Sequence, residues 1–338
     1  MSNSFEDILA TSIAVLIAPV WIPLSLAKDA VSYFKSKSAN SKNENKSVNK
    51  NNKNDNNNNN VPVDNETELN VFGMIRNTKI QDVKLIYPTA IYQQMQSISK
   101  ILSKDNFNEF QKRMIEKKFG RGYIALFHGV PGTGKTESVM QIAKNCGRDI
   151  YKIDIAEIES KYISETGLNV RNAFKNYKKC CNQAIKNNKP IPILLFNEAD
   201  ALIGKRHSLE SSNPVCVQDN NRTQNILLEE FENFEGILFM TTNIVCNLDK
   251  AFERRIFDKV EFKIPDIKTR MKIWQINLPT LTKQEIYVLA NDFKFSGGDI
   301  NLVMRNTVKL EIVKGRVPNY KEIYQICRRI KINAQNEV

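Results

Sequence analysis

Residues 129–136 read Gly-Val-Pro-Gly-Thr-Gly-Lys-Thr, and this stretch decides the fold. It matches the phosphate-binding loop pattern G-x-x-x-x-G-K-S/T, in which glycines let successive backbone N–H groups turn toward phosphate oxygens. In this pattern the lysine reaches the β- and γ-phosphates and the hydroxyl residue ligates Mg²⁺. The pattern predicts that ATP or GTP is bound, with Mg²⁺, by Gly129, Pro131, Gly132, Thr133, Gly134, Lys135, Thr136 and Glu137.

The residues on either side of this loop predict an α/β fold. Gly122–His128 is an apolar run that predicts a buried strand, and Thr136–Cys146 has apolar residues at helical spacing. A strand, a phosphate loop and a helix in this order are what a nucleotide-binding sheet requires. A third run, Pro190–Asp200, predicts a parallel strand whose polar end residues lie beside the loop, at the edge where open α/β sheets bind ligands.

Composition narrows the function classes. The 338 residues are 41% hydrophobic, which supports a substantial core and more than one domain. The six cysteines form no C-x-x-C pair and there are only two histidines, which excludes zinc sites and H-E-x-x-H proteases. The net charge of +12 comes from lysines scattered among acids, so we expect a solvated surface and no specific nucleic-acid partner.

The first 62 residues differ from the rest. Residues 8–27 carry no charge and just reach the length of a membrane span, although Pro19 and Pro23 weaken a helix there. We interpret residues 1–35 as a candidate membrane anchor, with an interfacial segment or a buried element as alternatives. The lysines that follow place the rest of the chain in the cytoplasm. Residues 36–62 are rich in Asn and predict a disordered linker, and residues 63–118 have helical apolar spacing.

Residues 119–330 resemble the AAA subgroup of the AAA+ ATPases in the number and order of their motifs. Pro-Ile-Pro-Ile-Leu-Leu-Phe-Asn-Glu-Ala-Asp at 190–200 resembles the Walker B strand. The resemblance implies that Glu198 polarises the attacking water. Asn197 stands where the family usually has Asp; it keeps an oxygen that can hold Mg²⁺ through water but lacks the negative charge. The resemblance further implies an AAA+ large domain over residues 119–263 and a small helical lid over 264–338.

Other motifs of the family can be matched residue by residue. Ile237–Asn243 resembles the sensor 1 strand, so that Asn243 contacts the γ-phosphate or the attacking water. Leu248–Arg255 is similar to the second region of homology, where Arg254 and Arg255 match the arginine fingers; a surface arginine pair is the alternative. Phe295–Ile300 resembles the sensor 2 turn, with Gly298 in place of the family's Ala, and the resemblance implies that the backbone at Gly298 approaches the adenosine of the nucleotide closely. Ser160–Thr166 resembles pore loop 1, with Tyr162 and Ile163 as the substrate grip, unless Tyr162 packs on its own domain.

We therefore expect an α/β protein with a P-loop NTPase parallel sheet, flanked by helices, and a C-terminal helical lid. The resemblance implies a homo-oligomeric ring, hexameric in the family, that hydrolyses ATP with Mg²⁺ to remodel or unfold proteins. The uncharged run at residues 8–27 predicts that this ring is tethered to a membrane. One alternative is a nucleotide-gated scaffold in which Asn197 slows turnover. A second is a nucleic-acid remodelling ATPase, motivated by the positive charge.

Overall fold

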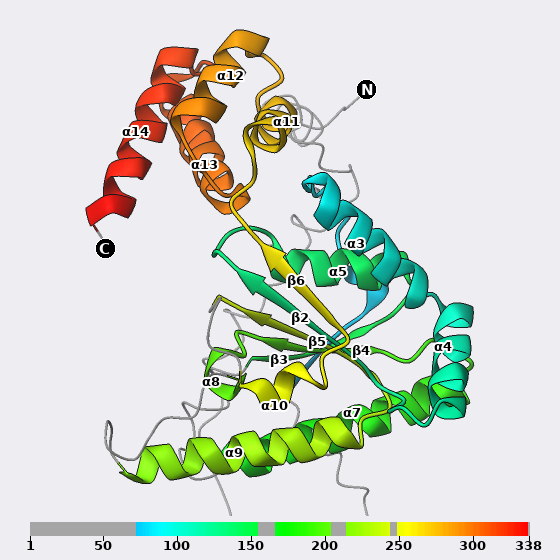
Figure 1. The fold of residues 1–338 in the computed structure, drawn as a ribbon. Coiled ribbons are helices and arrows are strands. Elements are labelled where there is room, and N and C mark those ends of the chain that lie inside the picture. Colours follow the sequence, from blue (N-terminus) through cyan, green and yellow to red (C-terminus); the bar gives the residue numbers. More distant parts are fainter. Residues whose placement is uncertain (1–71, 155–165, 204–213, 244–248, 337–338) are drawn as a thin grey trace, which may run out of the picture. The chain divides into compact units, whose positions relative to one another are not determined.

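The computed structural model describes residues 72–154, 166–203, 214–243 and 249–336. These residues form a six-stranded sheet with the strand order β1-β3-β4-β5-β2-β6 (Figure 1). β1 runs antiparallel to β3, and the other neighbours are parallel. The strands are β1 (Phe72–Ile75), β2 (Tyr123–Gly129), β3 (Ile150–Asp154), β4 (Ile193–Asn197), β5 (Ile237–Thr242) and β6 (Asp258–Phe262).

Helices cover both faces of this sheet, and the strand sequences show why. Every residue of β2 is buried, and alternate side chains enter different cores. Ile124 and Leu126 pack in the layer that includes α7 and α9, whereas Ala125 and Phe127 pack in the layer that includes α3 and α5. A parallel sheet buried on both faces requires such continuous apolar runs. The predicted fold class is therefore confirmed. The helices around the sheet are α3 (Thr89–Ile101), α4 (Lys104–Glu116), α5 (Lys135–Asn145), α7 (Thr166–Lys186), α8 (Asp200–Ile203), α9 (Pro214–Glu232) and α10 (Lys250–Glu253).

The segment before the P-loop strand is joined to the sheet. β1 pairs with the edge strand β3, from Phe72 opposite Ile153 to Ile75 opposite Ile150. A single 3-10 turn (Asn77–Lys79) follows, and α3 and α4 then bury apolar side chains in the same core as β2 and α5. The helical spacing of this segment predicts α3 and α4, but it does not predict β1.

The C-terminal helices form a separate small core. α11 (Ile267–Asn277), α12 (Lys283–Asp292), α13 (Gly297–Lys314) and α14 (Tyr320–Asn336) surround the buried Trp274. We call residues 267–336 the lid. Thr282 and Ser296 begin α12 and α13 with capping boxes, in which the cap side chain accepts a backbone N–H and the third helical residue returns a bond.

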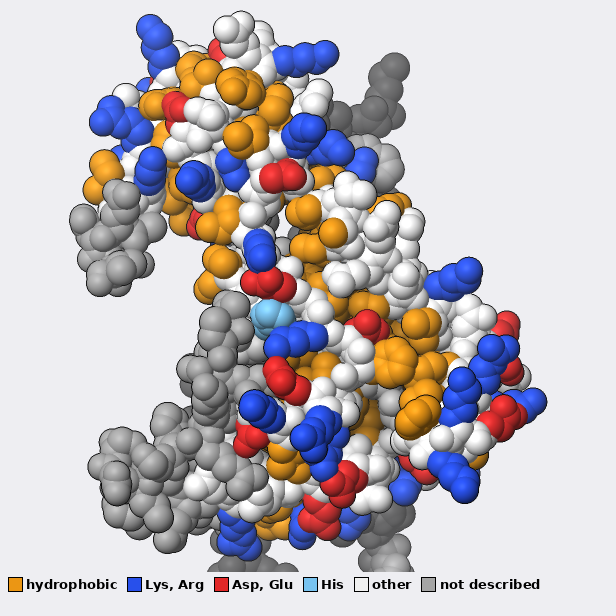
Figure 2. All heavy atoms as spheres, in the orientation of Figure 1, with side chains coloured by type: hydrophobic (Ala, Val, Ile, Leu, Met, Phe, Trp, Pro, Cys, Tyr) orange, Lys and Arg blue, Asp and Glu red, His pale blue; other side chains and the backbone are white. Residues whose placement is uncertain are grey.

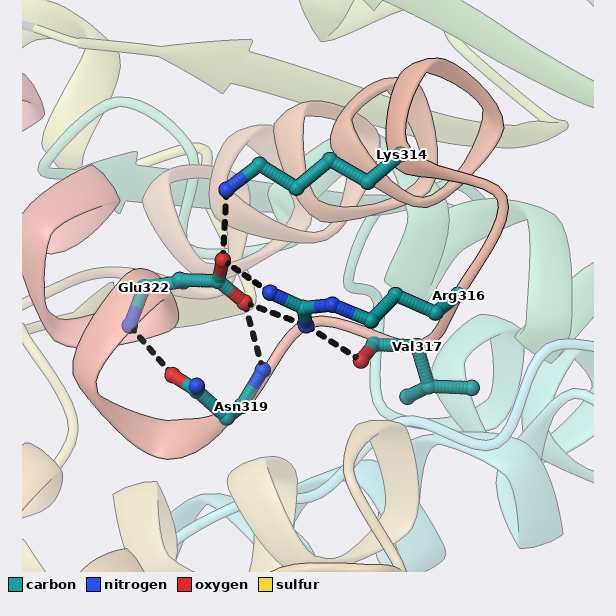
Figure 3. A network of polar contacts seen from close by, with 5 residues as sticks. All are labelled: Lys314, Arg316, Val317, Asn319 and Glu322. Carbon is teal, nitrogen blue, oxygen red and sulfur yellow. Dashed lines mark hydrogen bonds and ion pairs between the residues drawn. The ribbon is translucent and has the colours of Figure 1, made fainter.

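A polar network closes the turn between α13 and α14 (Figure 3). The carboxylate of Glu322 accepts bonds from Arg316 Nη1 and Nη2 at 3.0 and 2.8 Å and from Lys314 Nζ at 2.6 Å. It also accepts the backbone N–H of Asn319 at 2.8 Å, and the Asn319 side chain accepts the backbone N–H of Glu322 at 3.1 Å. The Arg316 guanidinium, followed by Lys314, lowers the pKa of Glu322 to about 2.

Three predicted features of the sequence lie outside the described residues: the candidate anchor at 8–27, the Asn-rich linker at 36–62, and the pore-loop pair Tyr162 and Ile163. In the ranges that the structure does describe, no helix is both long and apolar enough to cross a membrane. Over the lower part of the view in Figure 2, Lys and Arg side chains lie among Asp and Glu side chains and do not form a single basic patch.

Candidate nucleotide-binding site

The P-loop connects the end of β2 to the start of α5. Gly129, Gly132 and Gly134 all have positive φ angles, which other residues rarely adopt. A side chain at Gly129 would also overlap the backbone of Phe262 in β6. Thr133 closes the loop by donating its hydroxyl to the Val130 carbonyl at 2.6 Å. The loop leads into the N-terminus of α5, where unpaired backbone N–H groups favour an anion.

Lys135 brings the ends of β2 and β5 together. Its ammonium donates to the carbonyl oxygens of Gly129 at 2.8 Å and Val130 at 3.0 Å, and to Oδ1 of Asn243 at 2.8 Å. Only 8% of the residue is exposed. Burial lowers the pKa of Lys135, whereas the carboxylates of Asp200 and Glu198 act in the opposite direction. The residues predicted as phosphate ligand and sensor are therefore in direct contact.

A second chain of hydrogen bonds runs from the P-loop helix to β4. Thr136 donates its hydroxyl to Oδ1 of Asn197 at 2.7 Å, and the same oxygen accepts the hydroxyl of Thr241 at 3.1 Å. Thr241 in turn accepts the backbone N–H of Glu198 at 3.2 Å. Glu198 has a φ of 56°, a conformation that costs about 1–3 kcal/mol for a residue with a side chain. These contacts hold the Glu198 backbone while its side chain stays exposed.

Asp200 fixes the end of β5. Its carboxylate accepts the backbone N–H of Asn243 at 3.0 Å and the hydroxyl of Thr242. Because the Asn243 side chain accepts a hydrogen bond from Lys135, Asp200 helps to position the contact between Asn243 and Lys135.

The side chains at this edge of the sheet surround one cavity of about 270 Å³. The oxygen atoms that line this cavity suit Mg²⁺, which prefers hard oxygen ligands and keeps several waters. The Thr136 hydroxyl and the Asn197 amide oxygen are adjacent, and Glu198 lies beside them, so the residues fit the metal. The lining residues are Pro131, Gly132, Gly134, Lys135, Thr136, Glu137, Asn197, Glu198, Thr241, Thr242 and Asn243.

Comparison with known families agrees with this geometry. Residues 125–264 match the sequence model of the AAA family, "ATPase family associated with various cellular activities". This range begins within the P-loop strand β2 and ends just after β6, so it contains most of β2 and all of β3, β4, β5 and β6. Residues 125–264 therefore form an AAA-family ATPase domain.

Several proteins are similar to this chain. The 26S proteasome regulatory subunit 4 homolog B of Arabidopsis thaliana is 30% identical over 189 residues, which are 53% of this chain and 40% of that protein. Cell division protein C of Sulfolobus acidocaldarius is 26% identical over 225 residues, 63% of this chain and 59% of that protein. The chain thus spans less than two thirds of the length of either relative. A chain of the solved E. coli MS115-1 HORMA:CdnC:Trip13 complex shares the fold, with a TM-score of 0.58, 17% identity, and coverage of 76% of this chain and 93% of that one.

Gly298 joins the lid to the P-loop. Its backbone N–H donates to the Gly132 carbonyl at 2.7 Å. A Cβ at Gly298 would lie 2.9 Å from the Gly132 Cα, closer than real side chains approach. The glycine at this position, where the family has Ala, therefore permits close approach of the lid to the P-loop backbone.

The two candidate finger arginines differ in their surroundings. Arg255 is held within its own chain, since it pairs with Glu232 and donates to the Ala251 carbonyl at 2.6 Å. Arg254 is exposed, and within the described ranges it makes no hydrogen bond or ion pair. The sequence alone did not distinguish the surroundings of Arg254 from those of Arg255.

Four further residues at the site were not predicted from the sequence. Thr241 and Asp200 could have been found, because both are polar residues at or just after the end of an apolar strand. Leu85 and Tyr87 gave no local signal: the Leu85 side chain lies next to Gly134, and the Tyr87 hydroxyl donates to Ser138 of α5 at 2.8 Å. Burial raises the pKa of Tyr87 to about 12.

Proposed function

We propose that this chain is an ATP-hydrolysing AAA motor that works as a homo-oligomeric ring and acts on protein substrates. The observation that carries the proposal is the meeting of Lys135 with Asn243, beside Thr136 and Asn197, around one cavity. Phosphoryl transfer depends mainly on positioning and on compensation of charge, and these residues supply both.

The residues of the cavity would divide the work. The P-loop amides and the Lys135 ammonium would bind the phosphates of ATP. Glu198 would accept a hydrogen bond from the attacking water and orient it in line with the γ-phosphate, and Asn243 would contact that phosphate or water. The Glu198 backbone is fixed by Thr241, which limits the directions that its carboxylate takes.

Mg²⁺ would be held by Thr136 directly and by Asn197 through water. When bound, the ion would supply positive charge that compensates the charge of the phosphates during transfer. The neutral Asn197 contributes an oxygen but no negative charge.

The missing negative charge at Asn197 favours one alternative function, a scaffold that binds ATP and assembles but hardly hydrolyses the nucleotide. In that case ATP binding would be normal and turnover would be absent.

Hydrolysis by the full chain, measured over a wide range of protein concentration, separates the two functions. For a shared-site ring, specific activity rises steeply with concentration, because Arg254 of one protomer serves the nucleotide of the next. Glu198→Gln is expected to bind ATP and lose nearly all turnover. ATP binding without turnover at any concentration would favour the scaffold, and unchanged turnover in Glu198→Gln would remove Glu198 from the reaction.

Action on proteins and attachment to a membrane are further parts of the proposal. The proteasome regulatory subunits that the chain resembles, and the pair Tyr162-Ile163, support a polypeptide substrate. Residues 8–27 support a tether that leaves the ATPase domain in the cytoplasm. Deleting residues 1–35 would then move the protein from the membrane pellet to the supernatant, and continued pelleting would disprove the tether.

A further inference from the structure

A second cavity of about 530 Å³ lies at the opposite edge of the sheet from the P-loop. It is bounded by α4, α7, the residues that lead into β4 and the turn between α9 and β5. Ile191 and Gly236, which precede β4 and β5, both line it, so it faces the amino ends of the parallel strands. None of the residues assigned to nucleotide binding lines this cavity. Its size is typical of a ligand site.

A buried cation without a counter-ion lines this cavity. Arg148 is only 1% exposed and lies 5.1 Å from the ring of Phe107. Its Nε donates to the Leu102 carbonyl at 2.8 Å and its Nη1 to the Ile191 carbonyl at 2.7 Å. Nη2 has no hydrogen bond, and Arg148 has no carboxylate partner, among the described residues. A buried guanidinium is costly unless its charge and its donors are matched, so Nη2 is offered to an anionic ligand.

The rim of the cavity adds positive charge. Lys178 of α7 and Lys189, just after α7, line it and form no ion pair within the described ranges. Arg121 is paired with Glu235 at 3.1 Å, which neutralises both. Burial raises the pKa of Glu230, the remaining acid on the lining, whereas the charges of Arg171 and Lys178 act in the opposite direction.

The walls and the outer rim are apolar. Phe174, Tyr177 and Phe234 form buried wall. At the rim, Ile115 of α4 and Ile185 of α7 are 46% and 65% exposed although both line the same cavity. A ligand that covers them must extend beyond the cavity, as a peptide does and a small metabolite does not.

We propose that this cavity binds a segment of a protein partner in which an acidic side chain lies beside an apolar one. The carboxylate would reach Nη2 of Arg148 between Lys178 and Lys189, and the apolar side chain would cover Ile115 and Ile185. The cavity is separate from the nucleotide site, so partner binding here requires no ATP hydrolysis and stands apart from the proposed motor function.

Calorimetric titration of the full chain at low salt tests this proposal. The probes are acetyl-Leu-Glu-Phe-Asp-Leu-amide, its Gln/Asn counterpart acetyl-Leu-Gln-Phe-Asn-Leu-amide, and 3-phenylpropionate as the small-molecule arm. We expect the acidic peptide to bind at least about tenfold more tightly than the amide peptide, with an affinity that falls as salt is added.

Charge reversal at the rim provides the matched comparison. The double variant Lys178→Glu with Lys189→Glu is expected to bind the acidic peptide at least about tenfold more weakly than the unaltered chain does. Lys175→Glu with Lys179→Glu makes the same change in net charge on exposed positions of α7 that do not line the cavity, and should change affinity by less than about twofold. Arg148 also holds Leu102 and Ile191, so its replacement would test the fold as well as the site, and the rim variant is decisive.

Three results would overturn the proposal. They are no binding of the acidic peptide at millimolar concentration, equal affinity for the two peptides, and unchanged affinity in the rim variant. Binding of 3-phenylpropionate without binding of the acidic peptide would overturn the peptide as the occupant.

Discussion

The contact between Gly298 and Gly132 allows a sharp test of how the lid is positioned. In Gly298→Ala the new Cβ would lie 2.9 Å from the Cα of Gly132 and 3.3 Å from its carbonyl oxygen. Both neighbours are backbone atoms, so one of the two segments must shift. The hydrogen bond between them contributes about 1 kcal/mol, and overpacking costs about 1–3 kcal/mol. We therefore expect a cost of about 2–4 kcal/mol at this contact.

Nucleotide binding and thermal unfolding should both report this cost. Gly132 lines the nucleotide cavity, so a shift there displaces the N–H groups that face the phosphates. We expect the affinity for ATP, measured by titration, to fall about tenfold or more. We also expect Tm to fall by several degrees, since about 1 kcal/mol corresponds to about 2–4 °C for a domain of this size.

Gly297→Ala is the matched control. A Cβ at Gly297 meets only the Gly132 carbonyl oxygen, at 3.5 Å, which is an ordinary contact. This variant should bind ATP and unfold as the unaltered chain does. If Gly298→Ala also behaved like the unaltered chain, or if both variants lost affinity equally, the reasoning from this contact would be refuted.

Three further changes test other parts of the structure. Arg254→Ala should lower ATP turnover by about 10³-fold or more without changing Tm. Arg255→Ala should instead lower Tm, because its ion pair with Glu232 is lost. If ATPase and unfolding assays gave the opposite pattern, the roles of the two arginines would be exchanged. Asn197→Asp should lower the Mg²⁺ concentration needed for half-maximal ATP hydrolysis or leave it unchanged, since a carboxylate binds the ion more strongly; a clear increase would show a site adapted to the amide. The Glu322 carboxylate has a depressed pKa of about 2, so it stabilises the fold fully above its ordinary pKa of 4.5, and this stabilisation is lost as the pH falls from 4.5 toward 2. Glu322→Gln should therefore flatten this part of the curve of Tm against pH. An unchanged curve would contradict the stabilising role of the Glu322 carboxylate.

Local patterns in the sequence were sufficient to predict two central strands of the sheet. Apolar runs that end in polar residues predicted β2 and β4, and the order of strand, loop and helix placed Lys135 at the carboxyl edge. Asn197 was expected beside the P-loop, and its amide oxygen does accept a bond from Thr136. These features depend on residues close together in sequence, where periodicity is informative.

Features that depend on distant partners could not be predicted in this way. β1 has only four residues and is a strand because β3 offers an unpaired edge. Tyr87 reaches α5 from a segment without regular structure, and nothing in the neighbouring letters indicates Ser138 as its partner. Arg254 and Arg255 are adjacent in sequence, and only the position of Glu232 in the fold distinguishes them.

The antiparallel pairing of β1 has a mechanical consequence. Because Phe72 lies opposite Ile153, the chain enters the sheet close to the point where β3 ends at Asp154. Force applied to the residues before Phe72 would therefore act first on the four residue pairs between β1 and β3. These pairs lie at the edge of the sheet, far from β2 in the strand order. This margin can detach while the strands around the P-loop remain paired, so tension on the N-terminal region would strip β1 from β3 before it disturbed the nucleotide cavity.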